Sequence, residues 1–223
     1  MYIAKESFLG VNSEAGFYSL FEDFINKRSR VYVIKGGPGT GKSTLMRSIG
    51  KQAEQVPAGS DGLVMLPHLA GSNAPDVNAK AKGVWFGVTL QHTRAHFMRA
   101  VMESLGYIVR RNIDTLADMG IQVKTIRSLG GGAKSAVWNQ IKADINQISL
   151  ETVNSVEAAS LGAAILAGRA VGIFEDIPSA VASMVRVKDH IQPNPDNKAA
   201  YEQGYAMYQK LFRELTDCFE PSL

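Results

Sequence analysis

Apolar side chains recur every three or four residues along several stretches of the chain, and this spacing predicts amphipathic helices. The clearest stretches are residues 14–27, 42–55, 93–119 and 135–148. Ser135 precedes the last of them and suits the N-cap position, because a serine hydroxyl can accept from a free amide of the first turn. The stripe of the longest helix consists of Phe97, Val101, Leu105, Ile108, Ile113 and Leu116, and that of the fourth of Val137, Ile141, Ile145 and Ile148.

A further helical pattern ends the chain after Pro193 and Pro195. Its apolar residues alternate by four and three, but they extend over fewer than three heptads, which is short for a coiled coil. We therefore expect this helix to dock onto the body of its own domain. Its stripe consists of Tyr201, Tyr205, Tyr208, Phe212, Leu215 and Phe219.

Short apolar runs between the helical stretches predict strands. They lie at residues 31–34, 84–90, 121–129 and 149–153, and Gly87 indicates a bulge or a close backbone approach in the second. Residues 63–71 form another apolar run, residues 71–83 a polar loop and residues 156–168 a helix of small residues. Helices alternating with strands predict an α/β protein.

Composition and charge limit the number of domains, the kinds of partner and the compartment that we expect. The 223 residues are 45% hydrophobic and 20% charged, which fits one large or two small globular domains. A net charge of +3 with scattered basic residues argues against a nucleic-acid partner. The single Cys218 favours a reducing compartment. The N-terminus shows no signal-peptide pattern and the longest apolar run, residues 158–168, is too short for a bilayer, so we expect a cytoplasmic protein.

The sharpest motif is "KGGPGTGKST" at residues 35–44, which matches the phosphate loop G-x-x-x-x-G-K-[ST]. Glycines let backbone amides approach phosphate oxygens, and the N-terminus of the following helix favours the anion. The lysine is expected to reach the β- and γ-phosphates of ATP, and the hydroxyl of Ser43 to ligate Mg²⁺. The nucleotide-binding residues predicted here are Gly36, Gly39, Gly41, Lys42, Ser43 and Thr44.

A working phosphate loop also needs an acid at the end of a second strand to hold magnesium. The best candidate is "VGIFED", with Glu175 and Asp176 at its end, and the competing interpretation is a loop between helices. The first 55 residues resemble a family of bacterial P-loop ATPases. The shared pieces are "GFYSLF" at 16–21 and "KGGPGTGKSTLMRSIG" at 35–50.

A second glycine-rich turn lies in "SLGGGAKSAVWNQIKADI", residues 128–145, between a predicted strand and a predicted helix. A backbone free of side chains, followed by a helix N-terminus, suits a flat or anionic ligand. The alternative is a plain turn between strand and helix.

Residues 56–220 resemble the C-terminal domain of the FGGY carbohydrate kinases, with xylulokinases the nearest in character. The resemblance rests on residues 62–71, 81–110, 130–145 and 157–174. It implies an actin-like, ribonuclease-H-like ATPase fold. By this resemblance Gly131, Gly132 and Ala133 line the adenosine and α-phosphate side of a bound ATP, and Ser135 lies close by. The same resemblance makes residues 156–168 a close-packed connecting helix, and we expect Trp138 to pack rather than to stack on adenine.

The family's sugar site and catalytic aspartate belong to an N-terminal domain that this sequence does not resemble. We therefore assign no catalytic residue and expect little or no sugar kinase activity from this chain alone. The four histidines offer no metal cluster, although His92 and His96 lie one helical turn apart.

We interpret the chain as two parts, a truncated P-loop NTPase-like leader at 1–55 and an incomplete FGGY C-terminal domain at 56–223. The expected function is the ATP-binding portion of a xylulose-like kinase, with nucleotide as partner and a sugar if the missing domain is supplied. One alternative is an NTP hydrolase centred on Lys42. Another is a non-enzymatic fusion fragment that forms homo-oligomers by covering exposed sheet edges.

Overall fold

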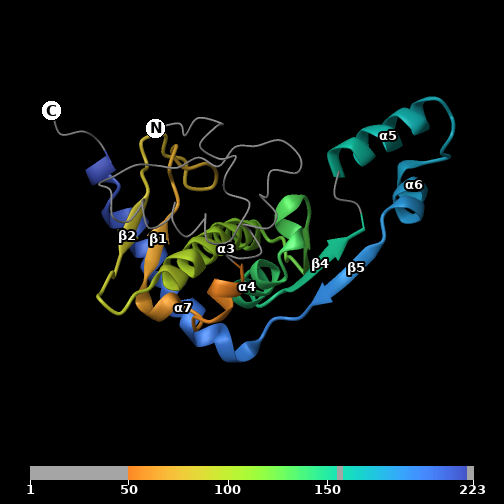
Figure 1. Ribbon diagram of the computed structural model, residues 1–223. Coiled ribbons are helices and arrows are strands. Elements are labelled where there is room, and N and C mark those ends of the chain that lie inside the picture. The colour runs from red at the N-terminus through yellow and green to blue at the C-terminus, as the bar shows by residue number, and fades with distance from the viewer. Residues whose placement is uncertain (1–49, 155–157, 220–223) are drawn as a thin grey trace, which may run out of the picture.

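The computed structural model describes residues 50–154 and 158–219, and shows helices packed beside two small sheets (Figure 1). β1 pairs antiparallel with β2, while β3 lies parallel to β4, and β5 pairs antiparallel with the other edge of β4. Parallel β3 and β4 are joined through α4, as an α/β unit requires. The elements are β1 (Val64–Leu66), β2 (Val84–Phe86), α3 (Arg94–Asp118), β3 (Thr125–Ser128), α4 (Ala136–Asn146), β4 (Ser149–Val153), α5 (Ala158–Ala170), α6 (Ile177–Met184), β5 (Val187–Ile191) and α7 (Lys198–Glu214).

The hydrophobic core lies where α3, α4 and α7 meet β1. Tyr201, Tyr205 and Tyr208 project from α7 into it and are fully buried. Ile141 and Ile145 face it from α4. The docking of the C-terminal helix onto the body of its own domain is therefore confirmed.

The predicted helix at 93–119 is confirmed as α3, with Thr93 and His96 forming a reciprocal capping box at its start. The predicted buried face of this helix is wrong in part. Its six apolar stripe residues are only half-buried, whereas Arg99, Glu103 and Ser104 are fully buried. Gly106 allows close packing, because a Cβ there would collide with Ile145 of α4.

The close approach predicted at Gly87 is confirmed. Its φ is +83°, and a Cβ at this position would lie 2.5 Å from the carbonyl oxygen of Gly62. Glycine is therefore required by both the backbone conformation and the space. The predicted strand at 121–129 is shorter than expected, because β3 covers only Thr125–Ser128.

The region after α5 corrects two expectations. Residues 171–175 form no strand, and the Oδ1 of Asp176 accepts from the amide of Ser179 at 2.7 Å as the N-cap of α6. Asp176 thus satisfies a helix end, and the loop interpretation of "VGIFED" holds. α6 and β5 have no counterpart among the predicted elements. β5 is a largely exposed edge strand, so its sequence lacks an apolar face.

α5 and α6 lie at the far end of the β4–β5 pair, away from α3 and α7 (Figure 1). The predicted close packing of α5 through its small residues is wrong for the described part of the chain. A Cβ on Gly162 would meet nothing within 4 Å, and α5 is buried only at Ile165 and Gly168. Its close contact is instead between Gly168 and Phe174.

The predicted helix at 14–27, the strand at 31–34 and the phosphate loop at 35–44 lie outside the described residues. Of the predicted helix at 42–55, the structure describes residues 50–54, which are helical. Within the described ranges, no helix is both long and apolar enough to cross a bilayer.

Candidate functional site

The turn between β3 and α4 presents bare backbone to open space. Gly130 has a φ of +74°, and Gly131–Lys134 form a single 3-10 turn. A Cβ on Gly130 or on Gly131 would meet nothing within 4 Å in the described structure. The two glycines therefore leave a surface on which a ligand can touch main-chain atoms directly.

Ser135 closes this turn and begins α4. Its hydroxyl accepts a hydrogen bond from the amide of Trp138 at 3.3 Å, so the predicted N-cap is confirmed. The remaining free amides of the first turn give the helix N-terminus partial positive charge. This end of α4 is therefore suited to an anionic group.

Gly132 is in a tighter position than its two neighbours. A Cβ there would lie 2.9 Å from the Trp138 ring, whose Nε1–H donates to the carbonyl oxygen of Met102 at 3.2 Å. The ring is thus fixed between the turn and α3. Trp138 packs behind the turn, as predicted.

Asn139 of α4 stabilises the turn through a hydrogen bond, and sequence reasoning did not identify this residue. Its Nδ2 donates to the carbonyl oxygen of Ala133 at 2.8 Å, and the residue is only 2% exposed. Its Oδ1 is buried and has no partner among the described residues. A buried acceptor left open is costly, and a ligand reaches this oxygen only if the turn moves.

Lys142 reaches the end of β3 from the second turn of α4. Its Nζ donates to the Oγ of Ser128 at 2.7 Å and lies 5.2 Å from the centroid of the Trp138 ring. Burial lowers the pKa of Lys142 to about 8. Sequence reasoning did not single out this lysine.

Polar side chains cross the three-stranded sheet beside this lysine. Ser128 of β3 is paired in register with Thr152 of β4, which is paired with Asp189 of β5. The Thr152 hydroxyl donates to Asp189 Oδ2 at 2.6 Å. Ser128 and Thr152 lie toward the carboxyl ends of parallel strands, the edge at which open α/β sheets bind ligands.

The first described residue, Gly50, lies at the same place. A Cβ on Gly50 would be 3.7 Å from Val137 Cγ2 and 3.8 Å from Ser135 Oγ. The chain therefore enters the described structure beside the N-terminus of α4. The predicted residues Gly36, Gly39, Gly41, Lys42, Ser43 and Thr44 lie outside the described residues.

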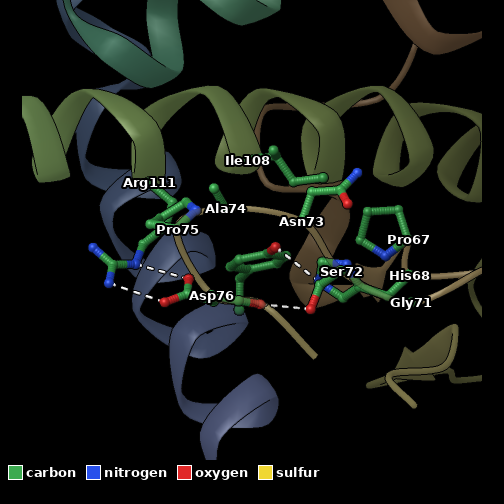
Figure 2. A pocket seen from close by; sticks show the side chains of 11 residues that line it. Pro67, His68, Gly71, Ser72, Asn73, Ala74, Pro75, Asp76, Ile108 and Arg111 are labelled. Atoms are coloured by element: carbon green, nitrogen blue, oxygen red, sulfur yellow. Dashed lines mark hydrogen bonds and ion pairs between the residues drawn. The ribbon is translucent and has the colours of Figure 1, made fainter. Parts of the chain in front are cut away.

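A separate pocket of about 160 Å³ opens between α3, α7 and the loop after β1 (Figure 2). Arg111 donates to both carboxylate oxygens of Asp76, from Nε at 2.8 Å and from Nη2 at 3.0 Å. His68 and Tyr208 share a hydrogen bond of 3.1 Å across the floor. Burial lowers the pKa of His68 despite the opposing effect of Asp76, so the ring is neutral near pH 7. These pairs tie the loop to both helices, and we assign the pocket a structural role.

His92 and His96 also have structural roles. The amide of Thr89 donates to His92 Nδ1 at 2.8 Å, and the amide of Thr93 donates to His96 Nδ1 at 3.1 Å. His96 Nε2 lies 2.9 Å from Asp61 Oδ2. Both rings thus fix the approach to α3. Across residues 50–154 and 158–219, no three His, Cys, Asp or Glu side chains converge as a metal site.

Comparison with known proteins identifies the family to which this fold belongs. Residues 23–171 match the FGGY family of carbohydrate kinases, C-terminal domain. The chain belongs to the FGGY family. Among its relatives, the xylulose kinase of Staphylococcus epidermidis is 37% identical over 156 residues, covering 70% of this chain and 32% of the relative. The xylulose kinase of Escherichia coli is 33% identical over 165 residues, covering 73% and 34%.

Solved structures agree with this assignment. The ligand-bound xylulose kinase of Lactobacillus acidophilus superposes with a TM-score of 0.71 at 26% identity, covering 78% of this chain and 35% of that one. The xylulose kinase of Rhodospirillum rubrum gives 0.70 at 30% identity, with 80% and 36% covered. This FGGY chain therefore spans about a third of the length of the relatives it matches.

The predicted likeness to the FGGY C-terminal domain is confirmed, and with it the α/β class. The family match begins at residue 23 and so includes the phosphate-loop motif. The likeness of residues 1–55 to P-loop ATPases, and the division of the chain at residue 55, stay predictions.

Proposed function

We propose that this chain is the ATP-binding portion of a xylulose-like carbohydrate kinase, and that it holds the nucleotide at the turn before α4. The observation that carries this proposal is the open glycine backbone at Gly130 and Gly131. In this proposal Gly131, Gly132 and Ala133 support the adenosine and the α-phosphate, and Ser135 keeps the helix start in place.

The residues at the turn suit a nucleotide in three respects. The bare glycine backbone accepts a flat group, and the N-terminus of α4 favours phosphate. The Oδ1 of Asn139, which has no donor among the described residues, would accept from a ribose hydroxyl or an amino group once the turn moved to expose it. When bound, ATP would supply the phosphoryl group, while these residues orient it.

Transfer to a sugar also needs a base at the acceptor hydroxyl. The family resemblance places that base outside the C-terminal domain, so we name no catalytic residue among the residues that match this domain. We expect the chain alone to give no turnover above background when pentoses and ATP are supplied. A coupled ADP-release assay over a panel of pentoses measures this, and clear turnover would contradict the expectation.

Replacing Gly132 with aspartate is expected to weaken ADP binding at least tenfold. The new side chain would press on Trp138 and would place negative charge next to the phosphates. Isothermal titration calorimetry measures the dissociation constant. The matched control is Gly162→Asp, which adds the same charge inside α5 at a position where a Cβ would meet nothing within 4 Å. Equal ADP affinity in the parent and in Gly132→Asp would reject this site.

A second candidate is nucleotide binding through Lys42, with Ser43 as the Mg²⁺ ligand. The position of Gly50 against Ser135 favours this candidate. Five residues lie between Thr44 and Gly50, and the six chain steps between them span at most about 20 Å. The phosphate-loop motif and the glycine turn can therefore serve one nucleotide, with the phosphates toward the motif.

Calorimetry on Lys42→Ala separates the two candidates. If both segments hold one nucleotide, Lys42→Ala weakens binding at least tenfold, and adding Gly132→Asp costs less than the sum of the two single changes. Full binding by Lys42→Ala would remove the motif from the site.

Self-association is the remaining part of the proposal. β2 and β5 form exposed sheet edges, and Trp85, Phe86 and Val88 are exposed near the first. Such edges favour pairing between copies. Light scattering over a concentration series tests whether the chain forms oligomers.

A further inference from the structure

Lys142 carries a half-buried positive charge beside the glycine turn. Its ammonium is held by Ser128, which lies two residues before Gly130, and faces the ring of Trp138, which packs against Gly132. Two neighbours of the ammonium are thus also neighbours of the turn. The group is therefore placed at the base of the proposed nucleotide site.

This charge has no carboxylate partner within the described residues. The nearby acids are committed elsewhere: Glu151 pairs with Arg127, and Asp189 accepts from Thr152. Asp144, two residues further along α4, accepts from Gln140, Asn194 and Asn197. Ser128 supplies a lone hydroxyl, which cannot balance a charge. An ammonium removed from water without a counter-ion is unfavourable.

We propose that Lys142 recognises the phosphate groups of the bound nucleotide, and this inference rests on the proposed function. Ser128 fixes the ammonium in position, and the anion supplies the missing negative charge. Lysine acts on phosphate as a point charge, so it contributes attraction without the planar geometry of arginine. Asn139 and the turn would then contact the nucleoside, whereas Lys142 would interact with the negative charge of its phosphate groups.

A structural role for Lys142 makes a different prediction. In that case the alkyl stem matters because it covers Trp138 and the end of β3. Methionine preserves most of this stem and removes the charge, while arginine keeps the charge. The pair Lys142→Met and Lys142→Arg therefore separates charge from packing.

The test compares ADP with adenosine on the full chain. We expect Lys142→Met to weaken ADP binding at least tenfold in calorimetry and to leave adenosine binding, followed by saturation-transfer NMR, within about twofold. Lys142→Arg should regain most of the loss. The control Lys210→Met removes one charge from an exposed position on α7 and should bind both ligands like the parent.

The other outcomes overturn the assignment in distinguishable ways. Equal ADP binding by the parent and Lys142→Met removes the lysine from the site while leaving the proposed function standing. Equal losses for ADP and adenosine make its role structural. A parent chain that binds neither ligand rejects the proposed function and this assignment together.

Discussion

Replacing Glu103 with alanine is expected to lower the free energy of unfolding by about 3–5 kcal/mol, a large share of the stability of a small domain. The Glu103 side chain is 2% exposed and projects from α3 into a buried network of charged and polar groups. Arg99 donates to it from Nε at 2.7 Å, and the Ser60 hydroxyl donates to its other oxygen at 2.8 Å. The amide of Gly59 donates as well, at 3.0 Å.

The same network joins distant parts of the chain. Arg99 also donates from Nη1 to the carbonyl oxygen of Ala53 at 2.9 Å and from Nη2 to the Tyr201 hydroxyl at 2.6 Å. Burial raises the pKa of Glu103, and its partners oppose that rise. The carboxylate is therefore costly to keep charged, and removing it leaves a buried guanidinium without its counter-ion.

Urea unfolding followed by circular dichroism measures the loss. The matched control is Glu214→Ala, since Glu214 is 60% exposed and pairs with Arg213 at the surface. Its effect is expected to stay within about 0.5 kcal/mol. Adding Arg99→Met to Glu103→Ala should cost less than the two single changes combined, because the residues form one network. A loss at Glu103 as small as that at Glu214 would contradict the network's importance.

This network also marks a limit of sequence reasoning. Apolar periodicity located α3 correctly but pointed to a stripe that is only half-buried. Arg99 and Glu103 occur four residues apart, a spacing that is typical of a solvent-exposed ion pair on a helix. Their burial depends on partners 43 to 102 residues away, at Ser60 and Tyr201. No local pattern carries that information.

Elements with local signals were predictable. Ser135 as an N-cap and the glycines before it located the start of α4, and the aromatic stripe located α7. β5 and α6 were missed because their signals are weak. The sequence "VKDHI" has no apolar face, since β5 is an exposed edge strand, and α6 covers only eight residues.

The residues of the candidate site also fall into those that the sequence predicted and those that it did not. Glycines 131 and 132 and Ser135 were predicted from a turn motif and a family resemblance, because backbone conformation leaves a mark in sequence. No sequence pattern pointed to Asn139 or Lys142. Their importance arises from what the fold places around them: a carbonyl at Ala133 for the first, and Ser128 without a nearby acid for the second.

Replacing Gly204 with alanine is expected to lower the free energy of unfolding by about 1–3 kcal/mol, although alanine is the better helix former. Gly204 lies inside α7, where a Cβ would collide with the hydroxyl of Tyr107 and lie 3.0 Å from its Cζ. Tyr107 is 2% exposed and belongs to the core of α3, so its ring has little room to move. The overpacking therefore outweighs the gain of about 1 kcal/mol in helix propensity.

Gly162→Ala is the matched control, because Gly162 lies inside α5 with nothing within 4 Å of a Cβ. There the propensity gain stands alone, and stability should rise by about 0.5–1 kcal/mol. Tyr107→Phe removes the colliding oxygen, so it should make Gly204→Ala less damaging in the double variant than in the parent background. Urea midpoints of the parent and the four variants measure these effects. Stabilisation by alanine at both glycines would show that α7 and α3 are not in close contact at this point.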